Sequence, residues 1–442
     1  MKNILVIGSG RSAVTLIKYL LENSVKNDWK VTVADFSLDS ALDAVDNNVN
    51  GRAILFNVED ELQRSKEIKG SDIVISMLPA SLHVTVAKDC IKFKKNLVTA
   101  SYVSNEIAAL NDEAKNAGVL LLNEIGLDPG IDHMSAMKVI DDIKDEGGEI
   151  TSFKSYCGGL VHPDYDDNPW NYKFTWNPRN VVLAGQGTAQ YIESNSYKYI
   201  TYTKLFERTD IVSVLDAGEF EGYANRDSLS YRKSYGLHNI STLFRGTLRR
   251  RGYSEAWNIF VQLGVTDDSY KVESSNTLTY RDFINMFLPC DSSISVEEKL
   301  CIEFNLSVNS TIYKKLEWLG IFSEKKVIIK NGSPAQILQS ILEDKWSLGT
   351  NDKDMIVMQH QFEYIYKNTK KKLNSSLIVF GDTPRFTSMA KTVGLPVAIA
   401  TKLILEGKIN EKGVKIPTSK EIYLPVLKEL SENGINFVEE LV

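Results

Sequence analysis

The sequence is poor in the side chains that build metal centres. Its 442 residues include only five histidines and four cysteines, which are Cys90, Cys157, Cys290 and Cys301. The cysteines are scattered without paired spacing and the histidines form no H-x-x-x-H pattern, so the common zinc-binding motifs are excluded. We therefore predict four free thiols and neither a structural nor a catalytic metal.

The chain also lacks an excess of basic residues and a long apolar run. Its formal net charge of −6 argues against a general nucleic-acid-binding protein. No run approaches the roughly 18 apolar residues that a membrane helix needs. A strand-like run starts at Lys2, so no signal peptide is expected. These absences predict a cytoplasmic protein that binds neither nucleic acid nor membrane, and the length predicts two or three domains.

What the sequence does contain, at its start, is a nucleotide-binding fingerprint. The apolar run 4–7 leads into Gly8, Gly10 and Ala13, in the form G-x-G-x-x-A, and a second apolar run ends at Asp35, 22 residues after Ala13. In such a βαβ unit the first glycine permits a tight turn, the second lets the backbone approach a pyrophosphate, and the alanine lets the helix pack on the strand. Asp35 stands where a carboxylate accepts hydrogen bonds from a ribose 2′-hydroxyl. The pattern predicts dinucleotide binding, and the alternative is a strand–helix turn that binds no nucleotide.

The carboxylate of Asp35 also bears on the choice of cofactor. It would repel a 2′-phosphate, and no arginine or lysine follows it in residues 36–38, so we expect NAD rather than NADP. The expected cofactor contacts lie around the turn and at the carboxyl ends of later strands. They are Gly8, Ser9, Gly10, Arg11, Ser12, Asp35, Asn57, Val58, Ser76, Leu78, Pro79, Ala100, Ser101, Leu127 and Asp128. Arg11 is either a phosphate contact or a solvated side chain, and no role is assigned to His83.

The order of apolar runs predicts the architecture. Strand and helix signals alternate over the first 125 residues, which is typical of a parallel, doubly wound sheet. Aromatic-rich runs after residue 150 indicate a mixed sheet, and the signal from about 277 to 346 is helical. The predicted fold class is α/β, with a Rossmann-type sheet and a mixed α/β domain that carries a helical insertion. The expected domains are 1–126 for the dinucleotide, 127–276 with 352–385 for the mixed domain, 277–351 for the insertion, and 386–442 packing back on the first.

Six further stretches carry a more specific resemblance. They are Val98–Tyr102, Gly126–Met134, Ser155–Leu160, Asn168–Trp176, Tyr223–Ser228 and Phe244–Tyr253. In this order the chain resembles the glutamate-forming saccharopine dehydrogenases, closely to about residue 260 and more loosely beyond. The resemblance implies an oxidoreductase that interconverts saccharopine, with NAD and water, and L-glutamate plus 2-aminoadipate 6-semialdehyde in lysine metabolism. Asp35 departs from the NADP-using fungal members, which carry a basic or small residue after the second strand.

The implied substrate carries three carboxylates, so its site needs fixed cations. A planar guanidinium suits a carboxylate because it forms paired hydrogen bonds. The resemblance places on the substrate Ser101, Tyr102, Asp128, Arg226, Thr247, Leu248 and Arg249. For Arg226 the alternative is a surface pair with the neighbouring Asp227.

The implied reaction also needs proton transfer. Hydride leaves the carbon next to a secondary amine that must be neutral, water then attacks the iminium, and a nearby proton acceptor assists. By the resemblance, the residues beside the reacting carbon are Tyr102, Asp128 and Cys157. Asp128 would orient the amine and stabilise the developing cation, although an Asp-Pro pair could instead start the helix that follows. Tyr102 either donates to the carbinolamine oxygen or packs under the nicotinamide, and Cys157 is more simply a small buried residue than a nucleophile.

Two other functions stay open at this point. A dehydrogenase of the carboxynorspermidine or lysine type has a substrate with fewer carboxylates, so the presence of both Arg226 and Arg249 argues against it. A non-catalytic NAD-binding regulator would keep the fingerprint but would need neither Asn225–Asp227 nor Thr247–Arg249. The sequence does not fix the oligomeric state, and a homodimer is one option.

Overall fold

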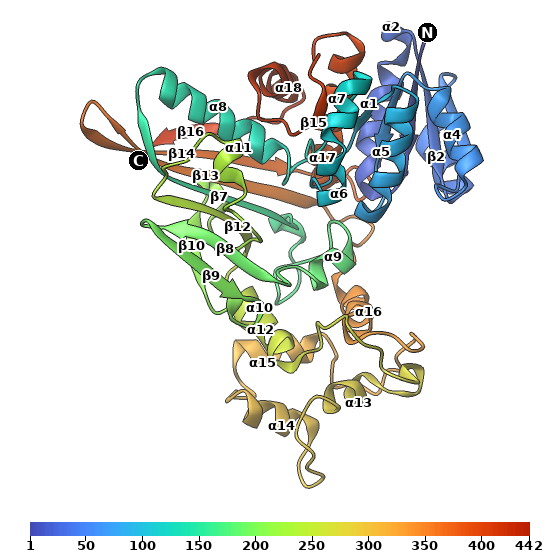
Figure 1. The fold of residues 1–442 in the computed structure, drawn as a ribbon. Coiled ribbons are helices and arrows are strands. Elements are labelled where there is room, and N and C mark those ends of the chain that lie inside the picture. The colour runs from blue at the N-terminus through green and yellow to red at the C-terminus, as the bar shows by residue number, and fades with distance from the viewer. The chain divides into compact units, whose positions relative to one another are not determined.

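The computed structural model describes all residues from Met1 to Val442 and divides them into two compact units (Figure 1). The first unit contains Met1–Glu149 and Val379–Val438, and the second contains Ile150–Ile378 and Glu439–Val442. Each unit is built around its own sheet.

A parallel sheet of seven strands forms the centre of the first unit. The strands are β1 (Lys2–Ile7), β2 (Trp29–Asp35), β3 (Gly51–Leu55), β4 (Ile73–Ser76), β5 (Asn96–Val98), β6 (Leu120–Leu122) and β15 (Gly413–Lys415). Their order is β15-β6-β5-β4-β1-β2-β3, and every neighbouring pair is parallel. The direction of progress reverses between β1 and β4, and ligands of such sheets bind at the carboxyl ends of the strands beside that reversal. The predicted doubly wound sheet is confirmed.

Helices cover this sheet. They are η1 (Arg11–Ala13), α1 (Val14–Glu22), α2 (Ser24–Asn27), α3 (Leu38–Val45), α4 (Glu61–Lys69), η2 (Ala80–Leu82), α5 (His83–Lys92), α6 (Asn105–Ala109), α7 (Asn111–Ala117), α8 (Ile131–Asp145), α17 (Ser388–Leu405) and α18 (Lys420–Glu432). The helix that follows the glycine turn, α1, packs closely on α17. A Cβ on Gly394 of α17 would lie 2.9 Å from the backbone nitrogen of Leu16, so glycine is what permits this approach.

The helix α17 is long and apolar enough, by length and composition, to cross a membrane. Its 18 residues have a mean hydropathy of 1.3, but they include Lys391 and Lys402 and so do not form an uninterrupted apolar run. However, 72% of the helix is buried inside the protein, where Val397, Ala398 and Ile399 expose no surface. A core helix passes the same test because burial in protein and burial in lipid select the same side chains.

The second unit contains a mixed sheet of nine strands. The strands are β7 (Glu149–Val161), β8 (Thr188–Glu193), β9 (Ser196–Thr201), β10 (Thr209–Ser213), β11 (Glu219–Ala224), β12 (Thr242–Arg250), β13 (Asp354–Tyr366), β14 (Thr369–Phe380) and β16 (Val438–Leu441). Seven follow the order β10-β11-β12-β7-β13-β14-β16, while β8 pairs with β12 and β9. The central strand β12 runs antiparallel to β11 and parallel to β7, so the sheet is mixed, as predicted.

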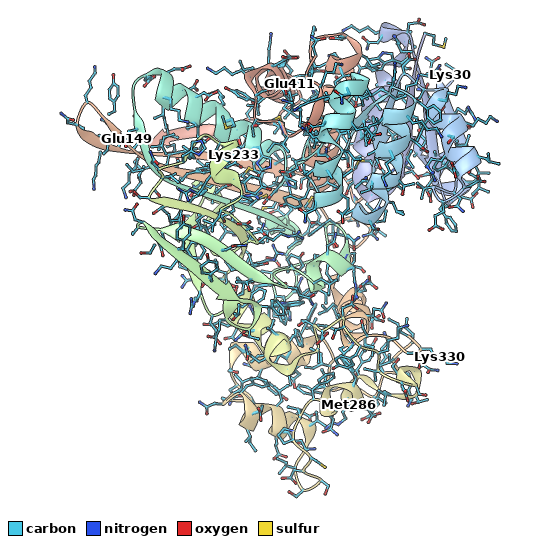
Figure 2. The ribbon with its side chains drawn as sticks, in the orientation of Figure 1. Lys30, Glu149, Lys233, Met286, Lys330 and Glu411 are labelled. Atoms are coloured by element: carbon cyan, nitrogen blue, oxygen red, sulfur yellow. The ribbon has the colours of Figure 1, made fainter.

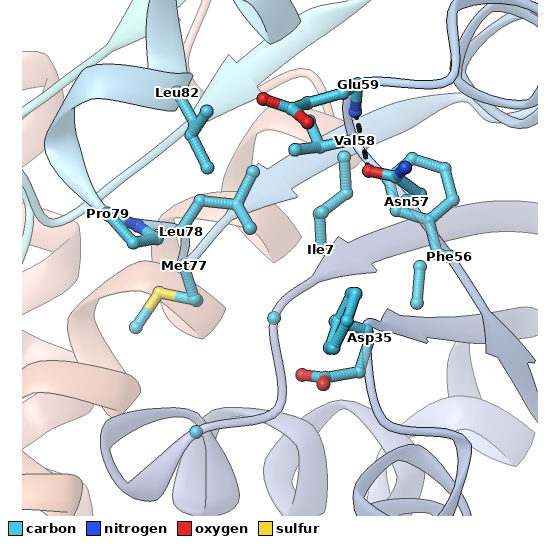
Figure 3. Close-up of a pocket in the computed structure, with 14 residues that line it drawn as sticks. Ile7, Asp35, Phe56, Asn57, Val58, Glu59, Met77, Leu78, Pro79 and Leu82 are labelled. Carbon is cyan, nitrogen blue, oxygen red and sulfur yellow. Dashed lines mark hydrogen bonds between the residues drawn. The ribbon is translucent and has the colours of Figure 1, made fainter.

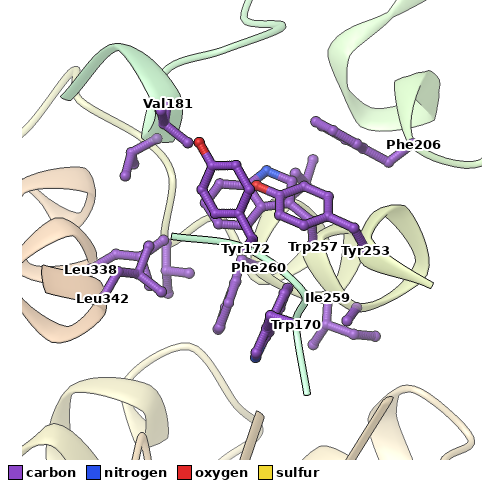
Figure 4. Packing of buried hydrophobic residues seen from close by; sticks show 14 of the residues in the cluster. Trp170, Tyr172, Val181, Phe206, Tyr253, Trp257, Ile259, Phe260, Leu338 and Leu342 are labelled. Carbon is purple, nitrogen blue, oxygen red and sulfur yellow. The ribbon is translucent and has the colours of Figure 1, made fainter. Parts of the chain in front are cut away.

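Most helices of the second unit contribute residues to one core that is rich in aromatic side chains. The helices of this unit are η3 (Pro163–Tyr165), α9 (Pro178–Val182), α10 (Tyr202–Leu205), η4 (Leu215–Ala217), α11 (Tyr231–Ser234), α12 (Tyr253–Leu263), η5 (Ser275–Thr277), α13 (Tyr280–Asn285), α14 (Val296–Glu303), α15 (Thr311–Trp318) and α16 (Pro334–Trp346). Trp170 packs edge-on against Trp346 of α16 at 5.1 Å between ring centroids, and Tyr253 stacks on Trp257 of α12 at 5.7 Å. Figure 4 shows Trp170, Tyr253 and Trp257 in this cluster, and Figure 2 labels Met286 just after α13.

The unit boundaries differ from the predicted domains in three places. The helix α8 belongs to the first unit rather than the second, because it packs on α18, where Tyr423 Oη donates to Asp141 Oδ2 at 2.6 Å. The helical segment α13–α16 is not a separate unit, because its apolar residues join the core of the second sheet. The last residues belong to the second unit through β16, where Val442 N donates to Lys372 O at 3.0 Å.

Candidate active site

The glycine turn after β1 borders a cavity of about 410 Å³ (Figure 3). Gly8 has a φ of +101°, and a Cβ on it would lie 2.9 Å from the carbonyl oxygen of Met77, so the fold itself requires glycine here. A Cβ on Gly10 would meet no protein atom within 4 Å, and the φ of −64° suits any residue. Internal packing does not explain this second glycine, whereas a pyrophosphate lying against the backbone does. The turn therefore fits the predicted dinucleotide.

These two glycines give a matched pair of variants. Gly10→Ala is expected to weaken binding of the reduced cofactor at least about tenfold, because the new methyl group occupies space that the pyrophosphate needs, while thermal stability stays near wild type. Gly8→Ala is expected to lower the free energy of unfolding by roughly 1–3 kcal/mol, because an L side chain is strained at this φ. Fluorescence titration and thermal unfolding of both variants check this. Full cofactor affinity in Gly10→Ala would show that no phosphate lies against this backbone.

Asp35, at the end of β2, has its carboxylate fixed beside the turn. Oδ2 accepts from the backbone nitrogen of Ser9 at 2.7 Å and from its hydroxyl at 2.8 Å, and Oδ1 accepts from Ser37 N at 2.9 Å. Burial by itself raises the pKa of the Asp35 carboxyl, but the hydrogen bonds from Ser37 and Ser9 outweigh it and hold the pKa below its ordinary value. The group is therefore ionised at neutral pH and keeps lone pairs for a ribose diol.

Seven of the residues predicted to contact the cofactor line the cavity. They are Gly8, Gly10, Asp35, Asn57, Val58, Leu78 and Pro79. The sequence reasoning missed Phe36, Phe56, Met77 and Leu82, which also line it. Phe36 is 84% exposed, and an exposed aromatic side chain directly after the acid at the strand end is a signal that could have been used.

The other predicted cofactor residues lie outside this cavity. Ser9 bonds to Asp35, Arg11 is exposed on the first turn of helix after Gly10, and Ser12 is half-buried. Leu127 is buried. Ala100 packs closely against Gly126, because a Cβ added to Gly126 would lie 2.9 Å from the Cβ of Ala100. Arg11, Ser12, Ala100 and Leu127 therefore do not line the cavity that holds Asn57 and Val58, whereas Ser9 lies beside it, between Gly8 and Gly10.

The two predicted serines at strand ends are joined through His83, a residue for which no role was predicted. Nδ1 of His83 lies 2.8 Å from Ser76 Oγ, and Nε2 lies 2.7 Å from Ser101 Oγ. Burial lowers the pKa of His83 to about 4, so the ring is neutral at neutral pH. A hydrogen-bond chain thus links the end of β4 to the segment that follows β5.

Tyr102 and Asp128, two of the three predicted catalytic residues, lie together. Tyr102 Oη donates to Asp128 Oδ1 at 3.3 Å. Asp128 belongs to a tight loop that is closed by a hydrogen bond from Gly126 N to Pro129 O at 2.9 Å. The N-cap of α8 is Gly130, and no side chain caps this helix. The alternative interpretation of Asp128 as the helix cap is therefore wrong.

The loop before Asp128 is held by a buried pair that the sequence reasoning did not identify. Glu124 is 5% exposed and accepts from His133 Nε2 at 2.9 Å and from Val103 N at 3.0 Å. Buried, mutually bonded groups of this kind rigidify their surroundings. The pair connects the end of β6 to α8 and so supports the loop that carries Asp128.

In the second unit, Arg249 on β12 is a buried cation without an acidic partner. The residue is 4% exposed, Nη1 donates to Leu248 O at 2.9 Å, and Nε has no hydrogen-bond partner. Tyrosine rings surround it, with centroids 5.0 Å (Tyr172), 5.3 Å (Tyr253) and 5.9 Å (Tyr223) from Cζ. A guanidinium stays charged when buried, so this arrangement is suited to an incoming carboxylate.

The residue opposite Arg249 does not neutralise it. Glu221 is its register partner on β11, but the Glu221 carboxylate accepts from the backbone nitrogens of Gly252 at 3.1 Å and of Ser254, at the start of α12. A carboxylate at a helix N-terminus satisfies otherwise unpaired N–H groups. Glu221 is thus occupied by the helix, which leaves the Arg249 guanidinium available.

Thr247 and Cys157 share the sheet face of Arg249. Thr247 is the register partner of both Tyr223 on β11 and Cys157 on β7, and register partners point to the same side. Leu248 alternates to the opposite side, where it is fully buried. The Leu248 side chain is therefore turned away from Thr247 and Arg249, and its carbonyl accepts from Arg249; its contact with the substrate stays a prediction.

Arg226 occupies the turn after β11, with a φ of +44°. The neighbouring Asp227 accepts from the backbone nitrogens of Leu229 at 2.8 Å and Ser230 at 3.3 Å, so its carboxylate holds the turn. Arg226 itself is exposed, and both its assignment to the substrate and the alternative surface pair stay predictions.

The cysteines and acidic groups do not assemble a metal site. All four cysteines are free thiols, as predicted, and no group of three or more histidine, cysteine or acidic side chains could hold a metal ion. Burial raises the pKa of the Cys90 thiol well above its ordinary range, so that thiol is unreactive.

Comparison with known proteins matches both halves of the chain. The family model of the saccharopine dehydrogenase NADP binding domain matches residues 4–122, and that of the saccharopine dehydrogenase C-terminal domain matches residues 126–435. The first match contains the glycine turn, and the second contains Asp128 and Arg249.

Individual relatives cover the chain from end to end. The saccharopine dehydrogenase (NADP(+), L-glutamate-forming) of Pyricularia oryzae is 34% identical over 451 residues, which is 100% of this chain and 99% of that protein. The mitochondrial alpha-aminoadipic semialdehyde synthase of Rattus norvegicus is 37% identical over 449 residues, and the chain spans 47%, about half, of its length. The solved structure of apo saccharopine dehydrogenase (L-Glu forming) from Saccharomyces cerevisiae has a TM-score of 0.90 and 34% identity over the whole of both chains. The chain belongs to the saccharopine dehydrogenase family.

Proposed function

We propose that this chain interconverts saccharopine, with a nicotinamide cofactor and water, and L-glutamate plus 2-aminoadipate 6-semialdehyde, in lysine metabolism. Relatives of matching length from three fungi bear the name of this L-glutamate-forming enzyme. The observation that carries the proposal is the buried Arg249 guanidinium, which has no acidic partner and faces Thr247 and three tyrosine rings. A substrate with three carboxylates supplies the missing counter-charge.

Each of the site residues has a separate proposed role in the reaction. The nicotinamide, when bound, takes up the hydride. We assign the substrate carboxylates to Arg226, Thr247 and Arg249. Asp128 orients the secondary amine and stabilises positive charge as the C–H bond breaks, and its partner Tyr102 moves a proton to or from the carbinolamine oxygen.

A cofactor and substrate screen tests the proposed reaction. Saccharopine with NAD or NADP is expected to produce the absorbance of reduced nicotinamide, whereas lysine with either cofactor is not, because lysine supplies one carboxylate where the site is built for several. Signal with lysine alone would favour the lysine dehydrogenase type. If saccharopine gives no absorbance of reduced nicotinamide with either cofactor, the result would favour the non-catalytic regulator instead.

We further propose that NAD is preferred over NADP. The family model and the fungal relatives carry NADP in their names, so this preference rests on Asp35 alone. Its carboxylate is ionised, is fixed by Ser9 and Ser37, and lines the cavity. A 2′-phosphate placed there would meet like charge at short range, whereas a 2′-hydroxyl would donate to it.

Asp35→Ser is expected to shift the ratio of kcat/KM for NAD over NADP toward NADP by at least about tenfold, since the repulsion is removed and a hydrogen-bond acceptor for the diol is lost. Steady-state kinetics with both cofactors measure the shift. Asp39→Ser, which removes an exposed charge from the first turn of α3, is the matched control and should leave the ratio unchanged. An unaltered ratio in Asp35→Ser would refute the assigned role. The cytoplasmic location and the homodimer stay predictions.

A further inference from the structure

The hydrogen-bonded chain Ser76–His83–Ser101, of which the first two residues are buried and Ser101 is half-buried, lies at the edge of the sheet where the cofactor is expected. Ser76 ends β4, His83 begins α5, and Ser101 follows β5, so the chain ties together three elements at the carboxyl ends of parallel strands. Ser76 has no exposed surface, and His83 is 3% exposed. Leu82, the residue before His83, lines the cofactor cavity in Figure 3.

Hydrogen-bond accounting determines which ring nitrogen of His83 carries the proton. Nδ1 of His83 is the one partner of the Ser76 hydroxyl, and Ser76 is fully buried. If Nδ1 carried the proton, Ser76 Oγ would accept it, and the serine hydrogen would be buried without an acceptor, which is costly. Ser76 therefore donates to Nδ1, and the neutral ring carries its proton on Nε2.

The tautomer in turn sets the direction of the last bond. Nε2–H donates to Ser101 Oγ, so the Ser101 hydroxyl hydrogen must point to some other acceptor. No protein acceptor takes it in the structure. We propose that His83 is a positioning residue, which acts as its Nε2–H tautomer to hold the Ser101 hydroxyl as a hydrogen-bond donor to an oxygen of a bound ligand. For the ligand this rests on the proposed function: the oxygen belongs to the carboxamide of the nicotinamide or to a carboxylate of saccharopine.

The tautomer can be measured without any ligand, so it does not depend on the proposed reaction. Proton–nitrogen correlation spectra of the full-length protein with isotope-labelled histidine are expected to show a neutral Nε2–H ring at neutral pH, assigned to His83 because it disappears in His83→Gln. Ser76→Ala removes the donor to Nδ1 and is expected to give a mixture of tautomers. A neutral ring protonated on Nδ1, or a charged ring, in the wild type overturns the proposal.

Two substitutions separate positioning of Ser101 from simple packing. His83→Gln keeps an N–H donor at the ε position, within reach of Ser101, whereas His83→Asn keeps an acceptor at the δ position for Ser76 and loses that reach. We expect His83→Asn and Ser101→Ala each to weaken the binding of one ligand about tenfold, which is the effect of losing one hydrogen bond to an anionic or carbonyl oxygen. His83→Gln should retain most of the wild-type affinity for that ligand. The double variant His83→Asn with Ser101→Ala should be no worse than Ser101→Ala alone.

The readouts identify the ligand as well. A weaker affinity for the reduced cofactor, measured by fluorescence without substrate, assigns the oxygen to the carboxamide, and a raised KM for saccharopine with unchanged cofactor affinity assigns it to a substrate carboxylate. The proposal is overturned if His83→Gln and His83→Asn lose the same affinity, if the losses of affinity add in the double variant, or if the binding of neither ligand changes. A wild-type enzyme inactive on saccharopine instead defeats the proposed function, while the spectra and the cofactor titration still decide the role of His83.

Discussion

Replacing Arg249 with leucine is expected to lower kcat/KM for saccharopine by about a hundredfold or more while leaving the protein at least as stable. A charge-assisted bond between a desolvated guanidinium and a carboxylate is lost, and removing one partner of such a pair costs about 2–5 kcal/mol of binding. Arg249 is buried without an ion pair, so the fold gains little from its charge, and an apolar side chain of lower desolvation cost replaces it. The measurements are steady-state kinetics and thermal unfolding.

The control for this variant lies two residues along the chain. Arg251 is 64% exposed and pairs with Glu219 at 2.8 Å, so Arg251→Leu removes the same group from a solvated ion pair and should leave kcat/KM within about twofold of wild type. Arg249→Lys should recover only part of the loss, because an ammonium lacks the planar fork. A marked fall in thermal stability with unchanged kinetics would show instead that Arg249 serves the tyrosine cluster around it.

The first sheet was predictable because each of its strands is defined by local sequence. Apolar runs of strand length end in polar residues such as Asp35 and Ser76, and a parallel sheet buried on both faces requires such runs. The domain boundary was not predictable in this way. The loop at Gly126–Gly130 is a local break, but the place of α8 depends on the contact between Asp141 and Tyr423, which are 282 residues apart.

In the candidate site, too, some residues could be predicted from local sequence and others could not. The glycine turn and Asp35 follow from spacing, since the chemistry needs those residue types at fixed positions along one βαβ unit. The role of His83 could not be predicted because its two partners, 7 and 18 residues away, lie at the end of β4 and after β5, which are brought together only by the order of the sheet. Alternation along β12, which the sequence also allows one to predict, puts Thr247 and Arg249 on one face and Leu248 on the other.

Asp128→Asn is expected to lower kcat for saccharopine oxidation by about a hundredfold to a thousandfold. Asparagine keeps the size of the side chain and can still accept from Tyr102, but it carries no charge to stabilise the cation that develops on the amine. The fold should be retained, because α8 is capped at Gly130 without help from Asp128. Single-turnover absorbance measurements report the chemical step directly.

Two comparisons decide whether Asp128 acts through its charge. Tyr102→Phe removes only the hydroxyl partner of Asp128, so a smaller loss of about tenfold is expected from it, and the loss should vary with pH because proton transfer to the carbinolamine is affected. Asp128→Ala should be no more active than Asp128→Asn, since neither restores the carboxylate. If Asp128→Asn instead turns over at the wild-type rate with its fold intact, the carboxylate has no part in the reaction, and the positive charge must be stabilised by another group.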